Sequence, residues 1–257
     1  MNDELKAALW ECTRQGNIFH TPKTQLDRKL YVELKKTIEN AGGKWKGGKV
    51  QGFVFDRDPT EIISKLRSGE AVDIKQKYQF FATPDKLADK LVSLVDWSKY
   101  KYPSILEPSA GQGALVKAVL RKKIEFAVLV MVELLDTNRM ILDKEFCNYD
   151  HPHIKLHNEP DFMKYTDDHT FDVIIANPPF SNNQDVMHIK TMYDHLNQGG
   201  TLVCITSKHW EFAGRNIERL FREWIMDLDD CEVIDVDPGE FKSSGTTVAT
   251  NIVIIRK

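Results

Sequence analysis

One short stretch of the sequence has residue types suited to holding a planar amino group. Residues 171–180 read Phe-Asp-Val-Ile-Ile-Ala-Asn-Pro-Pro-Phe, an apolar run that stops at two prolines. Such a run predicts a buried strand of a parallel sheet. Because neither proline donates a backbone hydrogen bond and each disfavours helix at the residue before it, we expect a stiff loop after the strand. This carboxyl edge is where open α/β sheets bind ligands.

The loop would present two hydrogen-bond acceptors and one aromatic ring. The side-chain oxygen of Asn177 and the carbonyl of Pro178 could together accept both hydrogens of a planar amine and draw its lone pair out of ring conjugation. Pro179 stiffens the turn, and Phe180 could stack on the ring that bears the amine. A proline-stiffened turn with a core phenylalanine explains the four residues alone equally well.

After such a strand, Asn177-Pro178-Pro179-Phe180 resembles the catalytic loop of the amino-methyltransferases, particularly the adenine-N6 DNA methyltransferases. The resemblance implies that these four residues are catalytic. It also implies S-adenosylmethionine as the cofactor and the exocyclic amine of a flipped adenine as the methyl acceptor.

Residues 104–115 form the second motif, a predicted strand followed by a small-residue turn and the start of a helix. Gly111 and Gly113 would let the backbone approach a ligand closely. The third glycine of a dinucleotide site and the Gly-Lys of a phosphate loop are both missing. Glu107 adds a negative charge, which suits an ammonium or sulfonium group better than phosphate. Together with Ser109, the turn resembles the S-adenosylmethionine loop of these methyltransferases.

An aromatic-x-Thr-Pro segment precedes this turn by about twenty residues. Thr83 is predicted to cap the helix that starts with Pro84. The resemblance adds a cofactor role, in which Phe81 and Thr83 contact the methionine end of S-adenosylmethionine.

Two acidic positions follow the next two predicted strands. Glu133 ends the strand at 127–132, where a carboxylate can accept both ribose hydroxyls; the alternative is a surface acid. Asp161 and Phe162 follow a strand around 154–156, and the resemblance implies that they bind the cofactor's adenine. The alternative for Asp161 is a helix cap.

The remainder of the chain contains a predicted helix at 183–196, a strand at 201–206, a long polar loop at 207–215, a helix at 216–228 and a terminal hairpin. His188 and His195 lie off the apolar stripe of the first helix, so we expect both to be exposed and without a role. The loop at 207–215 leaves the same sheet edge as the catalytic loop, so we expect it to close over substrate. The resemblance implies that Phe241, in the hairpin connection, packs on the flipped base.

Residues 1–75 indicate a separate basic unit with a β-α-β-β-α pattern, which contains 14 Lys and Arg against 11 Asp and Glu. In its predicted hairpin, Lys44, Lys46 and Lys49 are expected to contact nucleic-acid phosphates. Trp45 could stack on a base, but we favour a place in the small core with Phe53. A solvated face is the alternative for the lysines.

The composition is that of a cytoplasmic globular protein. The 257 residues carry a net charge of −3, which argues against a nonspecific nucleic-acid coat protein. No apolar run reaches membrane-spanning length and no secretory signal opens the chain, so we expect no membrane contact. The four cysteines are widely separated, which predicts free thiols and no metal site.

We therefore predict an α/β chain in which residues 76–257 form a seven-stranded, Rossmann-like methyltransferase sheet and residues 1–75 form a small α+β domain. The motif order resembles the gamma group of adenine-N6 DNA methyltransferases, with double-stranded DNA as the partner. These enzymes usually carry a large carboxyl-terminal recognition domain, and the sequence ends at Lys257 directly after the last predicted strand. Recognition is then expected from residues 1–75, from 207–215 or from a specificity subunit, which leaves a restriction-modification role open.

Several other methyltransferase functions use the same Asn-Pro-Pro-aromatic motif. Asn-Pro-Pro with an aromatic residue also serves enzymes that methylate guanine-N2 in ribosomal RNA or glutamine in release factors. An RNA adenine and cytosine-N4 are further targets, although cytosine enzymes more often carry Ser-Pro-Pro-Tyr. A catalytically silent DNA-binding subunit is the alternative from another class.

Overall fold

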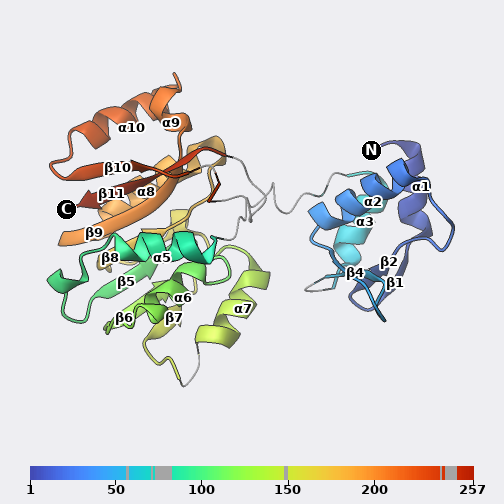
Figure 1. Cartoon of the computed structure of the whole chain (residues 1–257), viewed down its shortest axis with the longest axis horizontal. Coiled ribbons are helices and arrows are strands. Elements are labelled where there is room, and N and C mark those ends of the chain that lie inside the picture. The colour runs from blue at the N-terminus through green and yellow to red at the C-terminus, as the bar shows by residue number, and fades with distance from the viewer. Residues whose placement is uncertain (56–57, 71, 73–82, 148–149, 238, 241–247) are drawn as a thin grey trace. The chain divides into compact units, whose positions relative to one another are not determined.

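The computed structural model describes residues 1–257 except 56–57, 71, 73–82, 148–149, 238 and 241–247 (Figure 1). Two compact units divide the chain, Met1–Phe80 and Phe81–Lys257. Two predicted site residues, Phe81 and Phe241, lie outside the described residues. Among the helices that are described, none has the length and apolar character needed to cross a membrane.

The first unit is built on an antiparallel sheet with the strand order β1-β2-β4-β3. Its elements are α1 (Asp3–Glu11), β1 (Thr13–Gln15), β2 (Ile18–His20), α2 (Arg28–Asn40), β3 (Lys44–Lys46), β4 (Gly52–Val54) and α3 (Thr60–Ser68).

This unit contains one helix and one strand more than the predicted β-α-β-β-α pattern. Helix α1 is capped by Asn2, whose side chain accepts the backbone N–H of Leu5, and it buries Leu5, Ala8 and Leu9. Apolar residues spaced by three and four positions are typical of an amphipathic helix, so α1 could have been predicted from the sequence. Strand β1 pairs with β2, which lies inside the predicted strand.

The interpretation of Trp45 as a core residue is only half right. Phe53 is fully buried, whereas Trp45 is 38% exposed and packs against it with ring centroids 5.0 Å apart. On the other face of β3, Lys44 and Lys46 are exposed, as is Lys49 in the hairpin turn.

The second unit is an α/β sandwich. Its strands are β5 (Ser104–Glu107), β6 (Val128–Met131), β7 (Ile154–Leu156), β8 (Phe171–Ala176), β9 (Leu196–Ser207), β10 (Cys231–Asp235) and β11 (Thr250–Arg256). Its helices are α5 (Asp85–Ser93), α6 (Ala114–Arg121), α7 (Asp136–Phe146), α8 (Gln184–Asp194), α9 (His209–Phe212) and α10 (Asn216–Met226), with short 3₁₀ turns η1 (Trp97–Lys99), η2 (Phe162–Lys164) and η3 (Ser181–Asn183).

The seven strands lie in the order β10-β11-β9-β8-β5-β6-β7 (Figure 1). Strands β7, β6, β5, β8 and β9 pair in parallel, and β11 is antiparallel to both of its neighbours. The predicted seven-stranded sheet with one reversed strand is therefore confirmed. The register pairs Leu106 with Ile174 and Ala176 with Cys204, which places the ends of β5 and β8 at the same sheet edge.

Strand β8 shows why the central strand had to be apolar throughout. Val173 and Ile175 join the core that contains residues of α5, α6 and α7. Ile174 and Ala176 join a second core on the opposite face, with residues of α8 and α10. Because strand side chains alternate between faces and helices cover both, every position of β8 except the half-buried Asp172 is buried.

The predicted loop at 207–215 is wrong in part, because residues 209–212 form helix α9. Trp210 is buried, its indole Nε1 donates to Thr206 Oγ1 at 3.0 Å, and its ring meets Phe221 at 5.1 Å. Burial of one large aromatic residue is enough to fix a short helix that polar composition does not predict.

Candidate functional site

The loop after β8 is joined to the start of α5 by a side-chain hydrogen bond. Asn177 Nδ2 donates to Thr83 Oγ1 at 3.0 Å, across 94 residues of sequence. The amide oxygen of Asn177 is thereby directed away from Thr83. Pro178 is buried, and Phe180 packs partly buried against the core on the α5 side.

Thr83 does not cap the helix as predicted. Pro84 holds the N-cap position, α5 starts at Asp85, and no side chain caps the helix. The Thr83 hydroxyl is engaged with Asn177. The structure thus brings together Thr83 and Asn177, which the sequence had assigned to the cofactor and the catalytic loop separately.

Two asparagines directly after the catalytic loop adopt a backbone conformation that is energetically unfavourable for residues other than glycine. Asn182 and Asn183 have φ of 55° and 60°, a left-handed region that non-glycine residues rarely occupy in succession. Asn183 is buried, and its Nδ2 donates to Glu218 Oε1 at 2.7 Å. Two residues later, Asp185 Oδ2 accepts the backbone N–H of Ser207 at 2.9 Å and its hydroxyl at 2.8 Å. These buried bonds tie the loop to the end of β9 and to α10 and hold the strained turn in place.

The glycine turn after β5 is shaped by close packing. Gly111 and Gly113 have φ of 57° and 79°. A Cβ on Gly113 would lie 2.4 Å from Phe146 Cε2 and 3.2 Å from Leu142 Cδ2, so only glycine fits between this turn and α7. Both glycines are buried, and their N–H groups donate to Glu133 Oε2 and to the Ala110 carbonyl, so this backbone is fixed at the sheet edge where β8 also ends.

Glu107 lies beneath this turn as a fully enclosed acid. Burial, opposed by a hydrogen bond from the Val116 backbone, raises the pKa of Glu107 well above its usual range, and the nearby Glu133 charge raises it further. Its Oε2 atom is buried and has no hydrogen-bond partner in the described part of the chain. An unsatisfied buried carboxyl oxygen is costly, and a cationic ligand nearby would remove that cost.

Glu133 connects the glycine turn to the end of β6. Its Oε2 accepts the Gly111 backbone N–H at 2.7 Å, and its Oε1 accepts the Leu135 N–H at 2.8 Å and the Asn138 amide at 3.2 Å. Burial raises the pKa of Glu133, although these three donors and Arg139 lower it in part. A carboxylate oxygen has two acceptor sites, so Oε2 keeps one site that could accept one ribose hydroxyl, not both as the sequence prediction has it.

Asp161 and Phe162 follow β7, in the order expected. Asp161 caps η2 by accepting the Met163 N–H at 3.1 Å, which agrees with the cap alternative and leaves its other oxygen 3.5 Å from Lys164 Nζ. Phe162 is buried.

His188, expected to be exposed and without a role, is only 7% exposed and lies among the predicted cofactor residues. Its Nδ1 is 3.5 Å from Ser109 Oγ, and its ring centroid is 5.5 Å from that of Phe162. Burial lowers the pKa of His188 to about 4, although the Asp161 charge opposes the shift. Helix α8 packs on the sheet and on η2 together, so a position beside its apolar stripe is enclosed as well; periodicity along one helix does not reveal this second neighbour.

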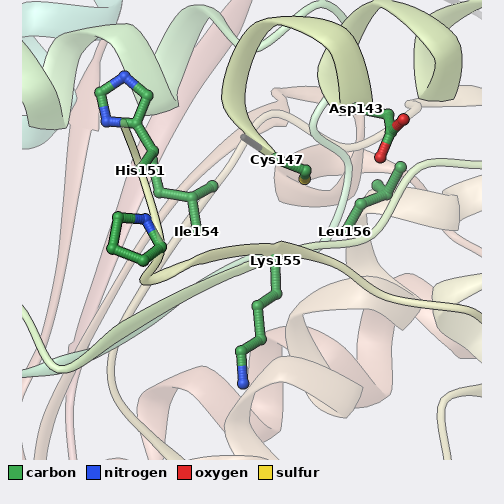
Figure 2. Close-up of a pocket in the computed structure, with 7 residues that line it drawn as sticks. Asp143, Cys147, His151, Ile154, Lys155 and Leu156 are labelled. Carbon is green, nitrogen blue, oxygen red and sulfur yellow. The ribbon is translucent and has the colours of Figure 1, made fainter. Parts of the chain in front are cut away.

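A surface pocket of about 420 Å³ lies elsewhere, between the end of α7 and β7 (Figure 2). Its lining includes Asp143, Cys147, His151 and Lys155 and none of the predicted site residues. In Figure 2 the Lys155 side chain extends away from Cys147 and His151, as strand alternation requires. Burial raises the pKa of the Cys147 thiol, so it is a poor nucleophile. In the described ranges no group of His, Cys, Asp or Glu side chains could hold a metal ion.

The donor set fits S-adenosylmethionine. Glu107 offers a buried oxygen without a partner in the described residues to a cationic group, and Glu133 Oε2 retains acceptor capacity for a ribose hydroxyl. Gly111 and Gly113 add no side chain between the turn and a ligand. Carboxylates around a glycine turn suit a sulfonium and an ammonium and would repel a phosphate.

Comparison with known proteins agrees with this chemistry. Residues 83–226 match the family model described as the methyltransferase small domain. No curated protein matches the chain in a sequence comparison.

Several solved structures share the fold at low identity. A type I restriction-modification methyltransferase subunit from Streptococcus thermophilus is 18% identical at a TM-score of 0.59, over 69% of this chain and 45% of that one. This chain thus spans less than half of that subunit. A protein assigned as an RNA methyltransferase from Pyrococcus horikoshii has 15% identity and a TM-score of 0.53, over 72% and 90%.

A protein assigned as a class I S-adenosylmethionine-dependent methyltransferase from Listeria monocytogenes has 16% identity and a TM-score of 0.56 over 99% of this chain and 79% of that one. These likenesses confirm the predicted Rossmann-like methyltransferase fold. Because the family model covers more than half of its residues, the chain belongs to the methyltransferase small domain family, and this membership implies S-adenosylmethionine as the methyl donor.

Proposed function

We propose that this methyltransferase modifies the exocyclic N6 amine of adenine in double-stranded DNA. The observation that carries the proposal is the hydrogen bond from Asn177 Nδ2 to Thr83 Oγ1 at 3.0 Å. Because this bond uses the donor end of the amide, the acceptor end is oriented in advance for a group that offers two hydrogens, as an amino group does.

The residues of the loop have separate roles in this proposal. Asn177 Oδ1 and the Pro178 carbonyl accept the two amine hydrogens and turn the nitrogen lone pair out of the ring, Pro179 keeps the turn stiff, and Phe180 stacks on the base. S-adenosylmethionine supplies, when bound, an electrophilic methyl group on a sulfonium. No general base is needed beforehand, since the amine becomes far more acidic once it is methylated.

The cofactor would be held by residues from four segments of the second unit. Thr83 meets its methionine end, as does Phe81 by sequence resemblance. The Gly111–Gly113 turn, with Glu107 and Ser109 beside it, receives the amino acid portion and the sulfonium. Glu133 accepts one ribose hydroxyl through Oε2, and Asp161 with Phe162 receives the adenine.

Charge supports a nucleic acid over a protein acceptor, and the nature of one structural relative supports DNA. Lys44, Lys46 and Lys49 are exposed on the first unit and offer phosphate contacts. A restriction-modification methyltransferase subunit shares the fold, and because this chain spans 45% of it, a separate specificity subunit would fit a restriction-modification role. Phe241 is the proposed second aromatic contact to the base.

The test is methyl transfer from labelled S-adenosylmethionine to duplex DNA, single-stranded DNA, RNA and protein, followed by identification of the product. N6-methyladenine in duplex DNA is the expected product. N2-methylguanine or N6-methyladenine in RNA, N4-methylcytosine in DNA or methylglutamine would contradict the proposed acceptor, and transfer to none of them would favour a silent subunit.

The substitution Asn177→Ala tests the role of the loop after β8. We expect transfer to fall by about a thousandfold or more, since the amine loses its orienting acceptor, while cofactor affinity changes little. Gln198→Ala is a matched control, because this exposed amide lies near the opposite end of β9. Undiminished transfer by the Asn177 variant would refute the assigned role.

A further inference from the structure

Phe212 is a large apolar side chain held out in solvent by a rigid support. It is 75% exposed and lies at the end of α9. Its ring meets that of His209 edge-on, with centroids 5.7 Å apart, so the two exposed rings form one surface. Apolar side chains exposed singly are common on protein surfaces, so a binding role for Phe212 depends on where it lies in the fold.

The support under Phe212 comes from the buried side of the same short helix. Trp210 is 5% exposed and bonds to Thr206, which fixes the helix on the end of β9. Arg222 of α10 donates to the Ala213 carbonyl at 2.8 Å and to the Trp210 carbonyl, and these bonds cap the carboxyl end of α9. The backbone that carries Phe212 is therefore fixed, so less conformational entropy is lost when Phe212 binds.

The position of α9 relative to the catalytic loop follows from the strand register. Ala176, the last residue of β8, pairs with Cys204, and β9 continues to Ser207. The chain that follows β9 thus leaves the sheet at the edge where Asn177 lies. The bonds from Ser207 to Asp185 and from Asn183 to Glu218 connect α9 and α10 to the segment that ends the catalytic loop.

We propose that Phe212 enters the DNA duplex and fills the gap left by the flipped adenine. The inference rests on the proposed function, because a flipped base leaves an unstacked space that an aromatic ring can occupy. Phe212 carries no polar group, so it can replace base stacking without an unsatisfied donor or acceptor. Arg215, exposed at the N-cap of α10 and three residues after Phe212, would offer its charge to a phosphate near that gap.

The test compares two duplexes that carry the same mapped target adenine, paired with thymine in one and opposite an abasic site in the other. The Phe212→Ala protein should methylate the paired duplex about tenfold to a hundredfold more slowly in single turnover. In this variant no aromatic ring replaces the stacking that is lost when the adenine leaves the duplex. On the abasic duplex, where the adenine is already loose, its rate should stay within about twofold of wild type. Phe212→Trp should retain the rate on both.

Met226→Ala is the matched control, because Met226 is 84% exposed at the far end of α10. A second readout is the fluorescence of 2-aminopurine in place of the target adenine, which should rise on binding of wild type and less with Phe212→Ala. Equal slowing on both duplexes, or no slowing on the paired one, would overturn the inference while adenine methylation by wild type stands. If wild type methylates no adenine in DNA, the proposed function falls and the inference with it.

Discussion

Two loops at the same edge of the sheet reach a defined shape by opposite means. The turn that contains Gly111 and Gly113 is shaped by the absence of side chains, since a Cβ on Gly113 would overlap Phe146. The corner that contains Asn177 is shaped by prolines and by side-chain hydrogen bonds to Thr83 and, through Asn183, to Glu218. In the proposed function, the first loop receives the cofactor against its backbone, and the second holds one planar amino group in one orientation.

This difference predicts different consequences for the two loops. A change in the glycine turn should damage folding and cofactor binding together, because its shape depends on packing against α7. A change in the asparagine corner should damage transfer and leave the fold intact, because its hydrogen bonds lie at the edge of the core.

The largest expected effect on the fold is that of Gly113→Ala. The added methyl would meet Phe146 at 2.4 Å in a backbone with φ of 79°. We expect a loss of about 2–4 kcal/mol in the free energy of unfolding and a large loss of cofactor affinity, measured by denaturant unfolding and by calorimetry. The control is Gly214→Ala, where a Cβ meets nothing within 4 Å. Equal stability of the two variants would contradict the packing argument.

A smaller effect, confined to transfer, is expected for Thr83→Val. The substitution keeps the shape and removes the hydroxyl that accepts from Asn177, so the amide loses its fixed orientation. We expect kcat to fall by about tenfold with the melting temperature nearly unchanged. Thr83→Ser retains the hydroxyl and should restore most of the rate. If both variants lose the same activity, the hydroxyl is not what orients Asn177.

The smallest effect on catalysis is expected at His188, which lies on α8 with its Nδ1 3.5 Å from Ser109 Oγ and so connects the two loops. Its pKa of about 4 in the folded protein is below the ordinary value of 6.5, so the unfolded chain binds the extra proton. Stability from this residue is therefore complete above about pH 6.5 and is lost as the pH falls towards 4, by about 3 kcal/mol at most.

We expect His188→Asn to reduce this loss of stability between pH 7 and pH 4.5, measured by thermal unfolding. The same variant should raise the KM for S-adenosylmethionine severalfold at pH 7.5, since the Ser109 side of the turn loses a neighbour, while kcat changes less. An unchanged KM would limit His188 to a packing role.

The sequence by itself determined much of the architecture and the identity of the loops. The unbroken apolar run before Asn177 required a strand buried on both faces, and two prolines required it to stop. Glycines with an acid before them indicated a turn for a cationic ligand. These features are local, because strand periodicity, proline geometry and glycine conformations depend on neighbours in the chain.

Other features were decided only by the tertiary structure. Thr83 was predicted to cap its own helix, yet its hydroxyl meets Asn177, 94 residues away. His188 looked solvent-facing along its helix but is enclosed by a second element, and the polar segment after Ser207 becomes a helix because Trp210 is buried. Each outcome depends on which side chain from a distant segment fills a given position, and such contacts leave no mark on the periodicity of either segment alone.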